Sequence, residues 1–282
     1  MDRIDLHTHS TASDGALAPA DLVAAAASAG VGVLALTDHD TTAGYEEAMR
    51  AGARYGVEIV PGVELGCGNG HEQTDILGYY FYPGDDDLQR LLTDIVTARE
   101  SRAERMVERL RDLGATITSE QVAALAAGGS VGRPHVARAL VDTGFVPDVP
   151  SAFREYIGPG RPAYADRYRL TPEEACRAVR AAGGVPVLAH PVPPADPWSD
   201  PKGLRSFLPP LVEAGLGGLE CYYPGYSAKV VRWLEALAWH FGLVPTGGSD
   251  YHGPWREGMG IGCVDVPPDV PERLRAAARG AA

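Results

Sequence analysis

The chain has 282 residues, 45% of them hydrophobic, which is enough for one large α/β barrel or one domain with an insertion. Its 25 Lys and Arg against 37 Asp and Glu give a formal net charge of −12, which argues against a protein that binds along duplex DNA. No apolar run reaches the roughly 18 residues needed to cross a bilayer, and the first residues lack the pattern of a secretory signal. We therefore expect a cytoplasmic protein that does not contact a membrane.

The first notable stretch runs from Asp5 to Asp14 and reads D-L-H-T-H-S-T-A-S-D. His7 and His9 alternate at strand spacing, so both imidazoles leave the same side of an extended backbone. Asp14 follows in a loop of small residues that can fold its carboxylate back over them. This pattern favours a metal site at the end of a strand, although two surface histidines near the start of a chain could also produce it.

Strand and helix patterns then alternate up to about residue 84. A helix is expected to end at Gly30, and another to run from about Ala43 to Tyr55. Three apolar strands are each adjacent to polar residues: Val33–Thr37 before Asp38 and His39, Ile59–Val63 before Glu64, and Ile76–Phe81 after Asp75.

From Asp85 to about Arg169 the pattern becomes helical throughout. Apolar residues at helical spacing predict one long helix to about Gly114, and shorter helices follow near Ser119–Ala127, Pro134–Thr143 and Val149–Tyr156. Arginine outnumbers acidic residues between Arg133 and Arg169, which suggests a small anionic substrate or the end of a nucleic acid. We interpret residues 85–169 as a helical insertion between two βα units.

The alternation resumes at Thr171-Pro172-Glu173-Glu174, which has the form of a capping box. Three further strands place polar residues at their ends: Val185–Ala189 before His190, Gly218-Leu219 before Glu220, and Val244–Gly248 before Asp250 and His252. A last strand, Ile261–Val264, is expected to close the sheet. The Arg- and Ala-rich helix after it is expected to be a terminal appendage.

The candidate ligands thus follow strands, and the carboxyl ends of parallel barrel strands meet at one rim. Histidine and carboxylate ligands without thiolates suit Zn, Mn or Fe, and so many of them predict two or three ions. Closely spaced ions favour phosphoester hydrolysis, with amide hydrolysis as the near competitor. Satisfied core histidines or polar strand ends are the alternative explanation.

The ordered motifs H-T-H-S-T-A-S-D-G, T-D-H-D, P-G-V-E, A-H-P and G-S-D-Y-H-G resemble those of the polymerase-and-histidinol-phosphatase (PHP) metal-dependent phosphoesterases. The chain is most similar to the stand-alone branch whose helical insertion carries G-R-P-H, here Gly132 to His135. The resemblance implies a distorted, TIM-like (β/α)7 barrel over residues 1–84 and 170–282, with the insertion at 85–169.

The resemblance also implies a trinuclear site. The three expected ligand sets are His7, His9, Glu64 and Asp250; Glu64, Asp75 and His190; and Asp14, His39 and His252. A metal-bridging hydroxide would attack phosphorus, with Asp38, His39, Glu64, His190 and Asp250 as the catalytic residues.

Asp75 departs from the family pattern, because many relatives have histidine at this position. A harder, anionic ligand biases the site toward Mn or Fe over Zn. A weakly held second ion is the other possibility, and His71 is a less favoured substitute ligand.

The expected reaction is hydrolysis of a nucleotide phosphomonoester, such as that of a 3′,5′-nucleoside bisphosphate. Arg133, His135 and Arg161 are expected to bind substrate phosphate, since guanidinium groups and helix N-termini suit it. The alternatives are a 5′-3′ exoribonuclease acting on short single-stranded RNA and a catalytically silent, metal-stabilised scaffold.

Overall fold

The structure is a computed structural model that describes residues 3–68, 74–126, 131–166, 169–192, 203–255 and 258–279. The chain forms two compact units, one of residues 1–89 with 170–282 and one of residues 90–169. Among the helices in these described ranges, none is both long and apolar enough to span a bilayer.

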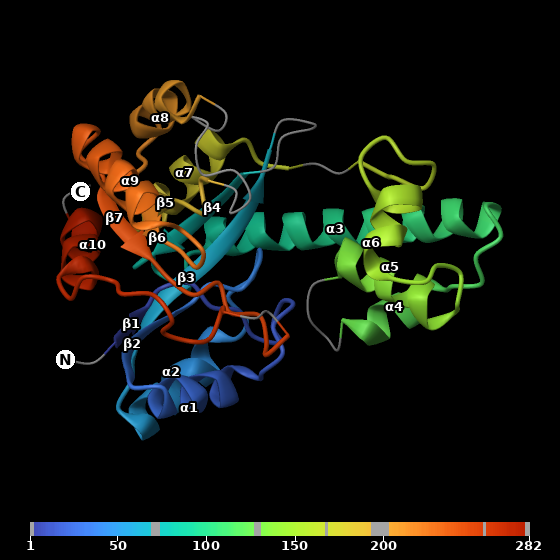
Figure 1. Ribbon diagram of the computed structural model, residues 1–282, viewed down its shortest axis with the longest axis horizontal. Helices are drawn as coiled ribbons and strands as arrows, with labels where there is room; N and C mark the ends of the chain where they lie inside the picture. The colour runs from blue at the N-terminus through green and yellow to red at the C-terminus, as the bar shows by residue number, and fades with distance from the viewer. Residues whose placement is uncertain are drawn as a thin grey trace. The chain divides into compact units, whose positions relative to one another are not determined.

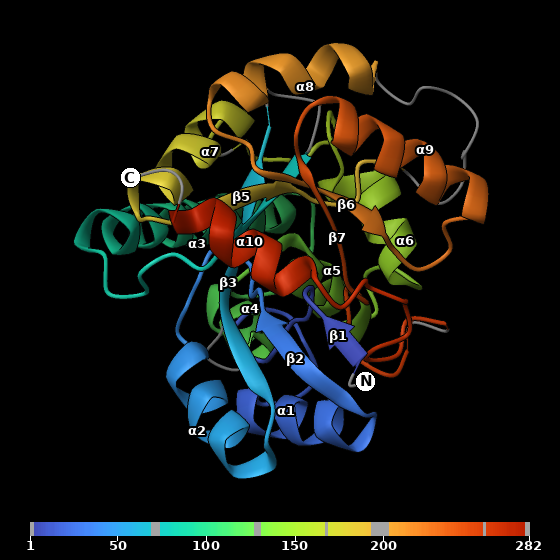
Figure 2. The ribbon, with the colours of Figure 1, turned by 90° about the vertical axis from the view of Figure 1, so that its left-hand side faces the viewer.

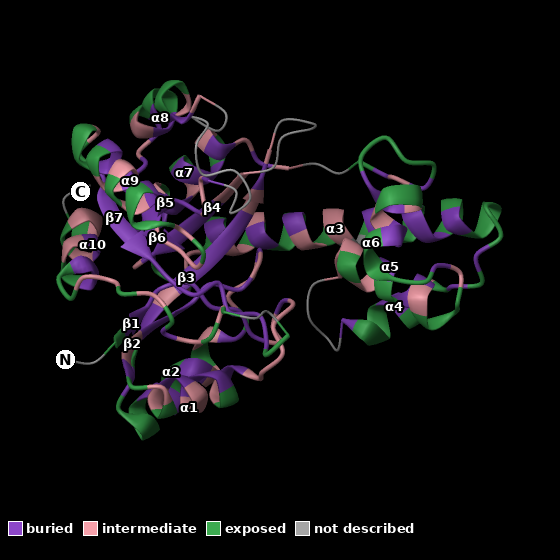
Figure 3. Ribbon diagram, viewed as in Figure 1, coloured by how far each residue is buried: buried purple, intermediate pink, exposed green. Residues whose placement is uncertain are grey.

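The described part of the larger unit contains a seven-stranded sheet whose strands follow one another in chain order (Figure 1). The strands are β1 (Arg3–Asp5), β2 (Val31–Leu36), β3 (Glu58–Cys67), β4 (Thr74–Tyr79), β5 (Val185–Leu188), β6 (Gly218–Tyr222) and β7 (Val244–Gly247). Their side chains are mostly buried, as the purple colour of the sheet shows (Figure 3). This burial explains the nearly continuous apolar runs in the sequence.

One strand breaks the expected parallel pattern. β4 runs antiparallel to both β3 and β5, whereas the other neighbouring strands are parallel. Because β4 is reversed, its first residues lie at the rim where the parallel strands end. Asp75 therefore reaches the same rim from the start of a strand.

The two outer strands of the sheet are joined by the segments that continue them. The Leu6 amide donates a hydrogen bond to the Gly247 carbonyl over 3.3 Å, and Thr8 forms a parallel bridge with Tyr251. The predicted closing strand Ile261–Val264 is wrong, because this stretch is a turn in which Gly262 has a φ of +69°. The predicted α/β fold with a distorted, barrel-like sheet is confirmed.

Helices cover the outside of the sheet (Figure 2). They are α1 (Pro19–Ser28), α2 (Tyr45–Tyr55), α7 (Pro172–Ala181), α8 (Leu204–Glu213) and α9 (Ala228–His240). The predicted capping box is present at α7, where Thr171 accepts from the Glu174 amide and Glu174 accepts from the Thr171 amide. No helix was predicted at the position of α8, because Pro209 and Pro210 lie inside it and proline normally disrupts a helix interior.

The final helix, α10 (Val270–Arg279), is part of the core. Val270 and Leu274 are fully buried and belong to one hydrophobic cluster with Val185 and Val244, the first residues of β5 and β7. Figure 2 shows α10 lying across the ends where the parallel strands begin. The expectation of a terminal appendage is therefore wrong, because the apolar face of this short helix covers the end of the barrel at which the parallel strands begin.

The smaller unit is helical in its described residues. Most of α3 (Asp86–Asp112) belongs to it, with α4 (Ser119–Leu125), α5 (Arg133–Asp142) and α6 (Val149–Ala152), and a π-helical turn follows at Phe153–Ile157. Met106, Leu110 and Leu140 are fully buried in its core. The helices predicted for this segment are confirmed.

Candidate metal centre

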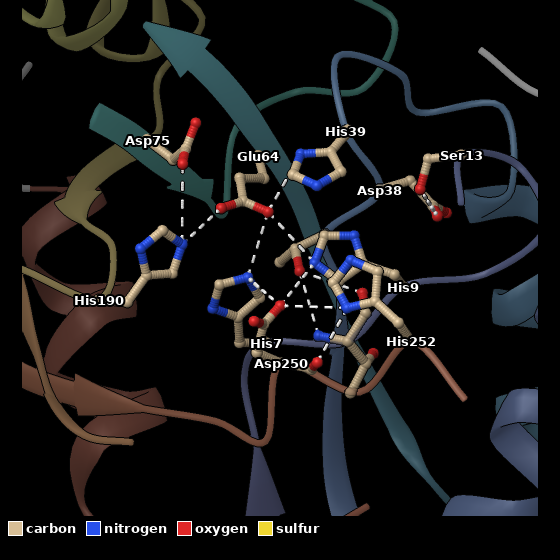
Figure 4. A network of polar contacts seen from close by, with 12 residues as sticks. His7, His9, Ser13, Asp38, His39, Glu64, Asp75, His190, Asp250 and His252 are labelled. Carbon is tan, nitrogen blue, oxygen red and sulfur yellow. Dashed lines mark hydrogen bonds and ion pairs between the residues drawn. The ribbon is translucent and has the colours of Figure 1, made fainter. Parts of the chain in front are cut away.

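Three groups of His, Asp and Glu side chains converge at the rim of the sheet, each with its ligand atoms within 4.8 Å of one another (Figure 4). The groups found in the described residues are His7, His9, Glu64 and Asp250; Glu64, Asp75 and His190; and His9, Asp14, His39 and His252. Every residue expected to bind metal is among them. Glu64 and His9 each belong to two groups, so the three groups form one continuous centre.

The first group is fully buried and starts from the histidine pair of the N-terminal strand. The Nε2 atoms of His7 and His9 lie 3.3 and 3.2 Å from Oε2 of Glu64. The same two atoms lie 3.4 and 3.3 Å from Oδ1 of Asp250. The alternation of strand side chains thus directs both imidazoles at one pair of carboxylate oxygens.

The second group uses the other oxygen of Glu64. Oε1 of Glu64 lies 3.1 Å from Nε2 of His190, which lies 3.8 Å from Oδ2 of Asp75. Glu64 lies within β3 rather than after it, and its two oxygens face different groups. His71, considered as a substitute for Asp75, lies outside the described residues.

The third group is completed by the loop that carries Asp14. Oδ1 of Asp14 lies 3.4 Å from Nε2 of His252, and Oδ2 lies 3.9 Å from Nε2 of His39. Asp38, an expected catalytic residue, lies outside the three groups. Its carboxylate accepts hydrogen bonds of 2.7 Å from the Ser10 amide and from the hydroxyls of Ser10 and Ser13, so its contacts fix the loop that presents Asp14.

The donor set suits divalent cations. Nε2 of His9 and Nδ1 of His39 face carboxylate oxygens of Glu64 and Asp250 at 3.2 to 3.3 Å. Nδ1 of His9 is buried and makes no hydrogen bond to any described residue, with Oδ1 of Asp14 4.0 Å away. A buried polar atom left without a partner costs about 1–3 kcal/mol, so such atoms point to a ligand. Imidazole and carboxylate together suit Mn, Fe or Zn.

The electrostatics of the centre favour cations strongly. Burial raises the pKa of Glu64, but nearby His39 and His7 outweigh it and hold that pKa well below its usual range. Burial lowers the pKa of His9, but Asp250 and Glu64 raise it to about 10. Ionised carboxylates are thus concentrated among buried imidazoles, where a divalent ion can take the place of the imidazole protons.

Glu220 contacts two residues of the candidate centre, and the predicted site omitted it. It is fully buried, and its Oε1 lies 2.9 Å from Nδ1 of His7 while its Oε2 accepts a 2.6 Å hydrogen bond from the His190 amide. Because Glu220 contacts Nδ1 of His7, the imidazole ring is held with its other nitrogen, Nε2, directed at Glu64 and Asp250. Its position after an apolar strand was visible in the sequence, but spacing cannot separate a metal ligand from a residue that orients one.

The three residues expected to bind substrate phosphate belong to the smaller unit. Arg133 is the first residue of α5, and its guanidinium carbon lies 5.4 Å from the centre of the Phe153 ring. Nδ1 of His135 accepts a 3.0 Å hydrogen bond from the Gly132 amide, which caps the helix. Arg161 is exposed in a loop.

Comparisons with known proteins agree with this geometry. The PHP domain family model matches residues 5–157. The chain is 34% identical over 281 residues to a 3′,5′-nucleoside bisphosphate phosphatase from Chromobacterium violaceum, covering 95% of this chain and 94% of that protein. It is 35% identical over 266 residues to a 5′-3′ exoribonuclease from Haemophilus influenzae, covering 93% and 96%. The crystal structure of a proposed metal-dependent phosphoesterase from Bifidobacterium adolescentis superposes with a TM-score of 0.85 at 30% identity, covering 98% of this chain and 96% of that one.

Proposed function

Because this chain belongs to the PHP family and is a metal-dependent phosphoesterase, we propose that it removes a phosphate monoester from a nucleotide, with 3′,5′-nucleoside bisphosphates as the first candidates. The observation that supports this most directly is the continuous centre in which Glu64 and His9 join three ligand groups. A single structural ion would not need so many convergent ligands.

Each of the three groups would hold one of the proposed ions. His7, His9, Glu64 and Asp250 would hold one ion, Glu64, Asp75 and His190 a second, and Asp14, His39 and His252 a third, with Mn, Fe and Zn as the candidate metals. Bound divalent ions lower the pKa of water and neutralise charge on phosphoryl oxygens, which is the chemistry that phosphoester hydrolysis requires.

The residues of the centre differ in their access to substrate. The side chains of His7 and His9 are 0% exposed and that of Glu64 is 1% exposed, whereas those of His39 and His190 are 21% and 28% exposed. His7, His9 and Glu64 thus form the buried side of the centre, and His39 and His190 form its solvent-accessible side. We assign His39 and His190 to the side that meets the phosphoryl group, where they would hold the ions that neutralise charge on its oxygens.

We further propose that Arg133, His135 and Arg161 bind a second phosphate of the substrate. A guanidinium group can make two parallel hydrogen bonds to phosphate, and the start of α5 offers backbone donors. Selectivity for a bisphosphate over a monophosphate would follow from these contacts.

Trimming of short RNA from its 5′ end is the second candidate, and the relative from H. influenzae favours it. Product analysis separates the two candidates. Mass spectrometry of products from a 3′,5′-nucleoside bisphosphate and from a short 5′-phosphorylated RNA would show either release of inorganic phosphate or release of mononucleotides.

The phosphoesterase activity itself is tested with para-nitrophenyl phosphate. We expect turnover with added Mn²⁺, loss of turnover with a chelator, and at least a tenfold loss in Asp250→Asn, because even removal of a group that only orients a ligand costs about 10- to 100-fold. His240→Ala is the matched control, since His240 lies exposed at the end of α9, outside the ligand groups. Mn²⁺-independent turnover, or full activity in Asp250→Asn, would contradict the proposal.

A further inference from the structure

Two of the proposed ligand residues have an unfavourable backbone conformation. His190 has a φ of +26° and Asp250 a φ of +51°, values that residues with a Cβ rarely adopt. Each follows the end of its strand, β5 or β7. Such residues persist only where surrounding contacts hold them in place, so the neighbours of both residues are informative.

The neighbours come from β6 and the loop that leads from it to α9. The Tyr223 hydroxyl donates a 2.8 Å hydrogen bond to Oδ2 of Asp250, and its ring centre lies 5.7 Å from that of His190 in an edge-on arrangement. The Tyr226 hydroxyl donates to the Val192 carbonyl over 2.7 Å and accepts from the Val192 amide over 3.0 Å. One loop thus contacts both strained segments.

We propose that Tyr223 and Tyr226 act as positioning residues that hold Asp250 and His190 in their ligating conformations. This inference rests on the proposed function, because it assumes that both residues bind metal. The rings of the two tyrosines also contact each other, with centres 5.2 Å apart, so the two hydroxyl contacts form one unit. We name this pair the tyrosine clamp.

Tyr223 has a second, more specific effect on Asp250. Oδ1 of Asp250 faces His7, His9 and His252 within the ligand groups, at 3.3 to 3.4 Å. Oδ2 is held by Tyr223 on the other side of the carboxylate. The phenol therefore fixes the rotation of the carboxylate and keeps Oδ1 directed at the imidazoles, as partners outside the ligand shell do for metal ligands in general.

The preceding residue provides a matched control. Tyr222 is the last residue of β6, and its hydroxyl donates a 2.7 Å hydrogen bond to Glu235 on α9. Tyr222→Phe and Tyr223→Phe each remove one phenolic hydroxyl and one hydrogen bond to a carboxylate. Only Tyr223→Phe removes a contact to the candidate metal centre.

The test is a calorimetric titration of Mn²⁺ into the full-length, metal-stripped wild type, Tyr223→Phe and Tyr222→Phe. We expect Tyr223→Phe to weaken Mn²⁺ binding about tenfold, in the range found when a group that orients a ligand is removed. Tyr222→Phe should bind as wild type does. Raising the Mn²⁺ concentration should restore turnover of para-nitrophenyl phosphate by Tyr223→Phe, which a folding defect would not allow.

The possible results separate the two proposals. If wild type binds no Mn²⁺, the metal centre and the clamp both fail. If wild type binds Mn²⁺ and Tyr223→Phe binds it equally well, only the clamp fails. If Tyr223→Phe melts at a lower temperature than Tyr222→Phe without metal, Tyr226→Phe replaces it in the test. The same tenfold loss of Mn²⁺ affinity is then expected, and Mn²⁺ binding equal to that of wild type would contradict the clamp.

Discussion

Asp75 is the proposed ligand whose carboxylate was expected to bias the centre toward Mn or Fe over Zn. The pKa of its carboxyl is raised by burial and by the charge of Glu64, and a nearby hard cation would lower this pKa by favouring the ionised form. We expect Asp75→His to raise the ratio of Zn to Mn bound from an equimolar mixture, because imidazole suits Zn better than carboxylate does. Elemental analysis of the loaded protein measures this ratio.

A matched control for this change is Asp94→His, which places a new imidazole on the exposed surface of α3. It should leave the ratio at the wild-type value. Equal Zn to Mn ratios in Asp75→His and wild type would show that Asp75 does not set the metal preference.

The pKa values of the histidines predict how metal binding depends on pH. Burial lowers the pKa of His190, but Glu64 and Asp75 raise it to about 9, and the pKa of His9 is about 10. Both imidazoles therefore carry a proton at neutral pH, and an imidazole must lose that proton to bind metal. Binding of Mn²⁺ should release protons, and its affinity should rise as the pH increases from neutral toward 9.

Calorimetry in two buffers with different heats of protonation measures this release directly. The observed binding heat should differ between the buffers in proportion to the number of protons released. Identical heats in both buffers, or an affinity that falls as the pH rises, would contradict the prediction that His9 and His190 are protonated before the metal binds and lose these protons on binding.

At the scale of single residues, the sequence identified the residues that converge in the three groups better than the residues that hold them in place. His7 and His9 were identifiable because strand alternation places them on one side, and Asp250 because it follows an apolar strand. Glu220 and Tyr223 were not identifiable as supports, since their roles depend on contacts with residues far away in the chain. Asp38 was expected to be catalytic from the family resemblance, and its serine contacts became visible only in the structure.

At the scale of secondary-structure elements, α10 provides the clearest stability prediction. Leu274 is fully buried in a cluster formed with residues of the barrel strands. Leu274→Ala should lower the free energy of unfolding by about 2–4 kcal/mol, the usual cost of truncating a buried leucine. Urea denaturation followed by circular dichroism measures this loss.

Arg279→Ala on the same helix is the control, because Arg279 is exposed at its end. It should change the stability by less than about 0.5 kcal/mol. Equal stabilities of the two variants would mean that α10 is not part of the core.

Each element that the sequence patterns missed or misassigned has its own physical reason. The reversal of β4 leaves no trace in its apolar run, because burial on both faces gives the same pattern in either direction. α8 contains two prolines that local propensity counts against a helix. Ile261–Val264 has strand-like residues, but Gly260 and Gly262 allow the turn that forms there instead.

At the scale of the whole molecule, the proposal that the helical unit contributes to substrate selection has its own test. Arg133→Ala should raise KM for a 3′,5′-nucleoside bisphosphate about tenfold or more, since a hydrogen bond to a charged group contributes about 1.5–3 kcal/mol. Turnover of para-nitrophenyl phosphate, which has one phosphate, should stay unchanged. Steady-state kinetics on both substrates measures the difference.

Arg138→Ala on the same helix is the control. Arg138 pairs with Asp142 over 2.9 Å on the exposed side of α5, so its removal should leave both KM values unchanged. If Arg133→Ala affects the two substrates equally, Arg133 does not recognise a second phosphate.

The most direct test of the metal centre is the number of Mn²⁺ ions bound, measured by native mass spectrometry on wild type and Glu64→Gln. Glu64 belongs to two of the three ligand groups, so its loss should affect more than one ion. Wild type should bind about two or three ions, and Glu64→Gln at least one fewer with its fold intact. A wild-type protein that binds no Mn²⁺, or a variant that binds as many ions as wild type, would contradict a shared metal centre built on Glu64.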